Sequence, residues 1–125
     1  MAEGFLRSFD AGLYIESAGT RPALLVNPFA VKVMQEVGID ISGNRTKNVD
    51  QFVNDSFDYV ITVCDHARET CPTFVGAVKH RLHLGFDDPA EATGTENQVL
   101  SEFRRIRDEI KSTFYSFYRN TLAQK

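Results

Sequence analysis

One nearly continuous apolar run constrains the fold of this chain more than any other feature. Phe57 to Cys64 reads FDYVITVC, a β-rich segment with the apolar character of a strand that is buried on both faces. A weaker alternating strand is expected within Lys79 to Leu84, and a third over Leu13 to Ala18. Because helical patterns alternate with these strands, we predict an α/β fold with a parallel sheet.

The helical patterns have recognisable ends. The opening MAEGFLRSF reads as a helix, and Asn27-Pro28 suits the start of another, for which Gly38 is a natural stop. Thr95 and Gln98 match a capping box at the start of the last helix. Two apolar faces are therefore predicted to pack in the core: Ala30, Val33, Met34 and Val37, and then Val99, Phe103, Ile106, Ile110, Phe114 and Phe117. A short helix is expected within Val49 to Asn54.

Composition excludes several classes of protein. The 125 residues, 42% hydrophobic and 25% charged, are typical of one globular domain spanning 1–125. The net charge of −3 provides no global attraction to nucleic acid or anionic lipid. No apolar run approaches the length of a membrane span, and no secretory signal pattern opens the chain. We therefore expect a cytoplasmic protein with no nucleic-acid or membrane partner.

The two cysteines, Cys64 and Cys71, lie seven residues apart, and Cys64 ends the best strand. Parallel sheets place their chemistry at the carboxyl ends of strands. A reducing cytosol disfavours a permanent disulfide. Cys64 alone would also suit a small buried apolar residue. A zinc site made of Cys64, His66, Cys71 and His83 matches no common ligand spacing, so we expect no metal.

A redox pair is a third interpretation of the two cysteines. If residues 65–70 are helical, the pair is separated by about 10.5 Å along the helix axis. A disulfide requires Cα atoms within about 7 Å of each other. The turn between Cys64 and Cys71 would therefore have to unwind before the two sulfurs could join.

An acidic motif, Phe86-Asp87-Asp88-Pro89, follows the weaker strand. One interpretation is a solvated turn, since Asp favours turns and Pro stops helices. The other is a positioned general acid beside the cysteine site. Asp88 is the better candidate for that acid, because the residue before a proline has a restricted backbone.

Taken together, these motifs resemble a known family, the thioredoxin-coupled arsenate reductases, which are built on the low-molecular-weight tyrosine phosphatase fold. The resemblance covers nearly the whole chain, and plain tyrosine phosphatases of this fold lack a cysteine pair at this spacing. The matching stretches are MAEG at 1–4, SAG at 17–19, NPFAVKVMQEVGIDIS at 27–42, FDYVITVCD at 57–65, Cys71-Pro72, GFDDPA at 85–90 and IRDEI at 106–110.

The resemblance implies a relay of three thiols that reduces arsenate. A first cysteine, in a C-x5-R phosphate loop, attacks arsenate, and the residue matching Cys64 then attacks the adduct. The residue matching Cys71 resolves the product into a Cys64–Cys71 disulfide, which thioredoxin reduces. Asp88 matches the acid that protonates the leaving oxygen. The resemblance implies arsenate and thioredoxin as partners, and we expect no cofactor.

The sequence departs from the family pattern in one respect: it contains no C-x5-R. In the family, MAEG directly follows the first strand and its phosphate loop. We therefore expect a three-layer α/β fold with a parallel sheet that lacks that strand and loop, exposed strand edges that allow self-association, and no useful activity from this chain alone. Two alternatives stay open: a low-molecular-weight protein tyrosine phosphatase, and a non-catalytic dithiol redox or metalloid-binding protein.

Overall fold

A computed structural model describes residues 1–18, 27–43, 47–63, 76–87 and 92–122 of the chain. The chain forms two compact units, and each is considered by itself. We call them the helical unit (Met1–Glu16, Leu25–Arg45 and Asp88–Lys125) and the sheet unit (Ser17–Leu24 and Thr46–Asp87).

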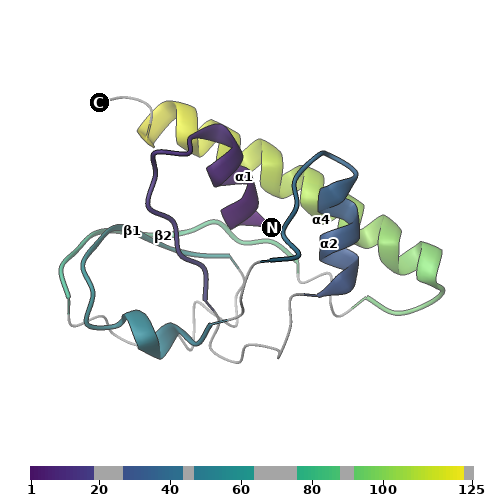
Figure 1. The fold of residues 1–125 in the computed structure, drawn as a ribbon, viewed down its shortest axis with the longest axis horizontal. Coiled ribbons are helices and arrows are strands. Elements are labelled where there is room, and N and C mark those ends of the chain that lie inside the picture. The colour runs from purple at the N-terminus through teal and green to yellow at the C-terminus, as the bar shows by residue number, and fades with distance from the viewer. Residues whose placement is uncertain (19–26, 44–46, 64–75, 88–91, 123–125) are drawn as a thin grey trace. The chain divides into compact units, whose positions relative to one another are not determined.

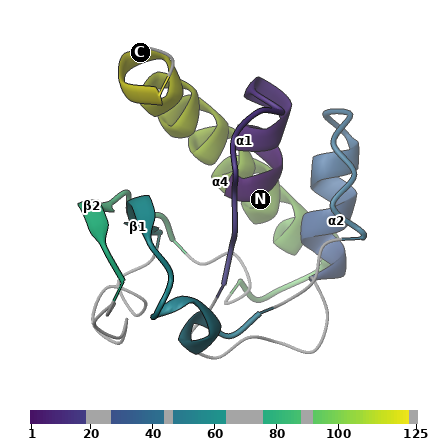
Figure 2. The ribbon, with the colours of Figure 1, turned by 60° about the vertical axis from the view of Figure 1, so that its left-hand side comes forward.

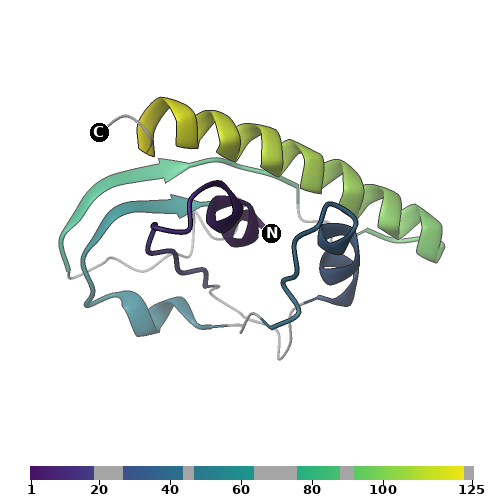
Figure 3. The ribbon, with the colours of Figure 1, turned by 45° about the horizontal axis from the view of Figure 1, so that its top comes forward.

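The helical unit contains α1 (Ala2–Phe9), α2 (Pro28–Gln35) and α4 (Glu96–Phe117), which continues into a π-helical turn, η3 (Tyr118–Leu122). Helices α1 and α2 both pack along α4 (Figures 1 and 3). The apolar side chains that pack between these helices form the core of the protein: Phe5, Leu6, Ala30, Val33, Met34, Ile41, Leu100, Phe103, Ile106, Ile110 and Phe114. No helix in the described part of the chain is both long and apolar enough to cross a membrane.

The capping signals of α2 and α4 form as predicted. The side chain of Asn27 accepts a hydrogen bond from the backbone N–H of Phe29 at 2.9 Å. Thr95 and Gln98 make both hydrogen bonds of a capping box, at 3.2 and 2.8 Å. Gly38 lies just beyond α2 with φ of +81°, a left-handed conformation that favours glycine.

The predicted apolar faces are largely confirmed. Ala30, Val33 and Met34 of α2 are buried, but the prediction for Val37 is wrong, because α2 ends at Gln35 and Val37 is 37% exposed. On α4, four of the predicted residues are buried and the two at the ends are half-buried. The buried four are Phe103, Ile106, Ile110 and Phe114, and the half-buried two are Val99 and Phe117.

The sheet unit contains a short 3-10 helix, η1 (Val49–Phe52), and two strands, β1 (Phe57–Thr62) and β2 (Val78–His83). The strands pair in parallel, in a register that runs from Phe57 opposite Val78 to Thr62 opposite His83 (Figure 2). Both strands and their direction are therefore as predicted. The side chains of β1 are mostly half-buried rather than buried on both faces, because the described part of this unit has no α-helix to cover the pair.

The third predicted strand, Leu13 to Ala18, does not form. These residues follow a turn after α1 and belong to no β-ladder in the described structure. The carbonyl of Ile15 accepts a hydrogen bond from the Arg7 guanidinium at 3.2 Å, and the side chain of Tyr14 is 78% exposed. Alternation of polar and apolar residues is only a preference, and a strand also needs a partner for its backbone groups. Here the Arg7 side chain of α1 hydrogen-bonds to one of those backbone groups, the carbonyl of Ile15.

Candidate functional site

The carboxyl ends of β1 and β2 lie at the same edge of the sheet, where the sequence places its candidate reactive residues. Backbone pairing continues past both strands, since Leu84 N–H donates to Thr62 O at 2.9 Å and Phe86 N–H donates to Val63 O at 2.8 Å. The two chain segments therefore leave the sheet side by side. One leads from Val63 into Cys64, and the other leads from Phe86 into Asp87 and Asp88.

The three predicted catalytic residues, Cys64, Cys71 and Asp88, lie outside the described residues, as does the turn over residues 65–70. Their immediate neighbours Val63 and Asp87 are described. The hydrogen bond between Val63 and Phe86 joins the residues that precede Cys64 and Asp87. The described backbone therefore supports a shared starting point for the cysteine and aspartate segments.

The side chains of Thr62 and His83 join these strand ends, and the sequence had singled out only His83, as a possible zinc ligand. Thr62 Oγ1 and His83 Nδ1 are 2.7 Å apart, and the two residues are opposite each other in the register. His83 Nε2 lies 2.8 Å from the position that a Cβ atom would take on Gly85. The zinc set proposed from the sequence did not include Thr62, and only the strand register could have paired His83 with it.

The other histidine of β2 has a different environment. The ring of His80 stacks on the ring of Tyr59, with 5.0 Å between the ring centroids. The two histidines of β2 therefore contact different partners on β1. Within the part of the chain that the structure describes, no group of three or more His, Cys, Asp or Glu residues is arranged to hold a metal ion.

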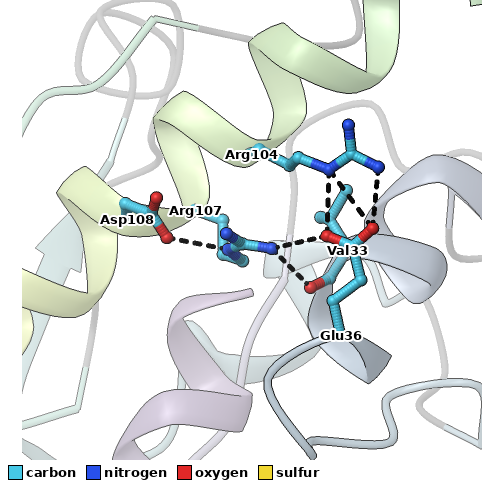
Figure 4. Close-up of polar contacts among 5 residues, drawn as sticks. All are labelled: Val33, Glu36, Arg104, Arg107 and Asp108. Atoms are coloured by element: carbon cyan, nitrogen blue, oxygen red, sulfur yellow. Dashed lines mark hydrogen bonds and ion pairs between the residues drawn. The ribbon is translucent and has the colours of Figure 1, made fainter. Parts of the chain in front are cut away.

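A cluster of charged side chains in the helical unit joins α2 to α4 (Figure 4). Arg104 donates to the Glu36 carboxylate through Nε and Nη2, at 3.0 to 3.2 Å and 2.8 Å. Arg107 donates through Nη1 to Glu36 at 2.8 Å and to the carbonyl of Val33 at 3.0 Å, and through Nε to Asp108 at 2.8 Å.

These contacts explain the electrostatics of the cluster. Hydrogen bonds from Arg104 and then Arg107 lower the pKa of Glu36 to about 2. The two arginines are paired with the two carboxylates of the cluster. No buried side-chain nitrogen or oxygen in the described residues is left without a hydrogen-bond partner. The cluster is therefore a structural link between helices rather than a binding site. Sequence reasoning missed it because Glu36 is 68 and 71 residues from its two arginine partners.

Comparison with known proteins places this chain in one family. The model of the low molecular weight phosphotyrosine protein phosphatase family matches residues 1–125, and the chain belongs to that family. The family match and the structural relatives confirm the predicted α/β fold and an enzyme family.

The relatives narrow the class to one branch, the arsenate reductases. The chain is 43% identical over 118 residues to the arsenate reductase of Halalkalibacterium halodurans, and 42% identical over 118 residues to that of Bacillus subtilis. Each match covers 94% of this chain and 84% of the relative.

Solved structures agree with the sequence relatives. An arsenate reductase in the oxidized state has a TM-score of 0.73 and 31% identity, over 90% of this chain and 80% of the other. An arsenate reductase in the phosphate binding state has a TM-score of 0.73 and 29% identity, over 95% of this chain and 86% of the other.

Proposed function

We propose that this protein is an arsenate reductase that works in the cytoplasm as a single domain over residues 1–125 and receives electrons from thioredoxin. The observation that carries the proposal is the match of 94% of the chain to proteins named arsenate reductase, at up to 43% identity. The paired strand ends add support, because the segment that leads to Cys64 starts beside the segment that leads to Asp87 and Asp88.

The proposed chemistry transfers two electrons. Arsenate gains two electrons and becomes arsenite, and one of its oxygens leaves as water. The thiols of Cys64 and Cys71 lose two electrons and two protons and form one S–S bond. Thioredoxin then reduces this disulfide by thiol–disulfide exchange and becomes oxidised itself. Asp88 protonates the oxygen that leaves.

The first step of the relay is assigned to no residue of this sequence. By resemblance to the family, arsenate is first attacked by a cysteine in a C-x5-R loop, whose backbone N–H groups and arginine stabilise an oxyanion. Neither Cys64 nor Cys71 is followed by an arginine at the required position. We therefore assign these two cysteines only to the later, redox steps.

The redox steps can be tested on the chain as it stands. After mild oxidation, peptide mapping by mass spectrometry should find Cys64 joined to Cys71. Thioredoxin, its reductase and NADPH should then reduce that bond with an equimolar loss of NADPH. Cys64→Ser and Cys71→Ser should each abolish this NADPH loss, while Asp88→Asn should leave it unchanged. Oxidised protein in which the two sulfurs never join each other would sink the proposal.

The arsenate step is tested in an N-terminally extended version that carries a C-x5-R loop. With thioredoxin present, this version should produce arsenite, and Asp88→Asn should slow that production. Both cysteine variants should stop multiple turnovers, because the disulfide that thioredoxin reduces can no longer form.

A protein tyrosine phosphatase is the second candidate, and the name of the matched family favours it. The same extended version separates the two activities. Two results together would favour the phosphatase. The extended version would produce no arsenite, and its hydrolysis of an aryl phosphate would persist in Cys64→Ser and Cys71→Ser. A non-catalytic dithiol protein is the third candidate, and tight arsenite binding without turnover would favour it.

A further inference from the structure

Thr62 and His83 form a side-chain pair that the proposed reaction does not use. These residues are register partners at the last position of the two parallel strands. Their side chains are half-buried and approach to 2.7 Å, a short hydrogen bond that crosses from β1 to β2. A second contact, from Thr62 Oγ1 to the carbonyl of Leu82, is 3.5 Å long and adds little.

The imidazole of His83 also faces the chain that follows β2. Its Nε2 atom lies 2.8 Å from the point where Gly85 would carry a Cβ atom, so the ring lies over the Gly85 backbone. Gly85 precedes Phe86, whose N–H donates to Val63 O at 2.8 Å. The ring therefore spans the gap between the end of β1 and the segment that leads to Asp87 and Asp88.

We propose that His83 is a positioning residue, which acts through Thr62 to hold the chain entering Cys64 beside the chain entering Asp87 and Asp88. We call Thr62 and His83 the strand-end clamp. This assignment deepens the proposed function and rests on it, since Cys64 and Asp88 are there the residues that react. A reactive pair on two separate segments needs a fixed spacing, because small displacements of reacting groups are costly in rate.

The chemistry of the two side chains suits a clamp. A threonine hydroxyl both donates and accepts, and His Nδ1 can act in either role. The same oxygen–nitrogen contact can therefore be kept whichever tautomer the ring adopts. The β-branched side chain of threonine also has a restricted χ1 angle, which helps to hold its hydroxyl toward the neighbouring strand.

An engineered cross-link can measure the spacing that the clamp controls. The parent variant combines Cys71→Ser with Asp87→Cys, so that Cys64 and the introduced thiol follow the hydrogen-bonded residues Val63 and Phe86. Neighbouring strands are about 5 Å apart, within the Cα separation of about 7 Å that a disulfide accepts. Equilibration in glutathione redox buffers then measures how readily the two thiols join, expressed as the effective concentration of one thiol near the other. This measurement needs neither arsenate nor thioredoxin.

The clamp predicts a specific pattern among four further variants of this parent. His83→Ala and Thr62→Val should each lower the effective concentration about three- to tenfold, as expected for the loss of one half-buried hydrogen bond. Thr62→Ser keeps the hydroxyl and should restore the parent value. His80→Ala lies on the same strand but contacts Tyr59, and should leave the value unchanged. Thermal unfolding of each variant separates positioning from a general loss of stability.

Each outcome decides the proposal. An unchanged effective concentration in both Thr62→Val and His83→Ala, or an equal fall in His80→Ala, would overturn it. A parent that forms no cross-link would also overturn it, because the two segments would then not start side by side. Failure of the proposed function looks different: thioredoxin would not reduce the oxidised native chain, while the pattern among the clamp variants would persist.

Discussion

The link between α2 and α4 makes a quantitative prediction about Arg107. The side chain of Arg107 is only 11% exposed, and its Nη1 donates both to Glu36 and to the carbonyl of Val33. Val33 is in the last turn of α2, where backbone carbonyls lack partners within the helix. The N–H of Val37 donates to Met34 instead, so Arg107 supplies the bond that the helix does not.

The cost of removing Arg107 follows from these contacts. Arg107→Met keeps an apolar stem but leaves the buried carbonyl of Val33 without its donor, which costs about 1–3 kcal/mol. The loss at Glu36 is smaller, because Arg104 still holds that carboxylate through two nitrogens. The pair with Asp108, whose side chain is 63% exposed, adds little. We expect the free energy of unfolding to fall by about 2–3 kcal/mol in total.

Thermal unfolding followed by circular dichroism measures this loss. For a domain of this size, about 2–3 kcal/mol corresponds to a decrease in Tm of about 6–12 °C. The matched control is Arg105→Met, two residues earlier on the same helix. Arg105 also makes two ion pairs, with Glu102 and Glu109, but all three side chains are close to half exposed. Exposed pairs of this kind are each worth less than about 1 kcal/mol.

The comparison of the two arginine variants tests the physical reasoning directly. If burial of the donor decides the cost, Arg107→Met must be clearly less stable than Arg105→Met. Equal decreases in Tm would refute the argument, because the two variants remove the same charge from the same helix. A smaller decrease for Arg107→Met would show that the carbonyl of Val33 finds another donor.

Three further predictions concern pH and the ends of helices. The pKa of Glu36 is about 2 in the folded protein and 4.5 ordinarily, so its stabilising effect is complete above pH 4.5 and disappears as the pH falls through about 2. The free energy of unfolding should therefore differ between wild type and Glu36→Gln by an amount that shrinks as the pH falls over that range. A difference that stays constant with pH would contradict the pairing. Gly38→Ala should lower stability by about 1–2 kcal/mol in urea unfolding, because φ is +81° there, and no loss would show that the turn rearranges. Thr95→Ala should cost about 1 kcal/mol through the lost cap of α4, whereas Thr95→Ser should unfold at nearly the wild-type temperature.

Features of the structure that depend on neighbouring residues in the chain were open to prediction. The caps at Asn27 and Thr95 form because a side chain and the backbone N–H that it accepts from are only two or three residues apart. The stop at Gly38 needs only a residue that tolerates a positive φ. The strands from Phe57 and Val78 follow from β-rich composition, and their parallel direction follows from the connection between them.

The segment from Leu13 to Ala18 shows where local pattern fails. Its alternation is that of a strand, yet Arg7 takes the carbonyl of Ile15 and no ladder forms in the described structure. Whether an alternating segment becomes a strand depends on a partner for its backbone, and that partner comes from elsewhere in the chain. Val37 fails for a related reason, because the end of α2 decides which side chains still face the core.

The sequence by itself determined the class of fold, the helix caps, the parallel pair of strands and the family resemblance that names Cys64, Cys71 and Asp88 as candidates. Only the tertiary structure decided that Thr62 meets His83, 21 residues away, and that Glu36 meets Arg104 and Arg107, 68 and 71 residues away. The physical reason is range. A hydrogen bond within one turn of chain follows from local geometry, whereas a bond between distant residues exists only after the register of the strands and the packing of the helices have been set.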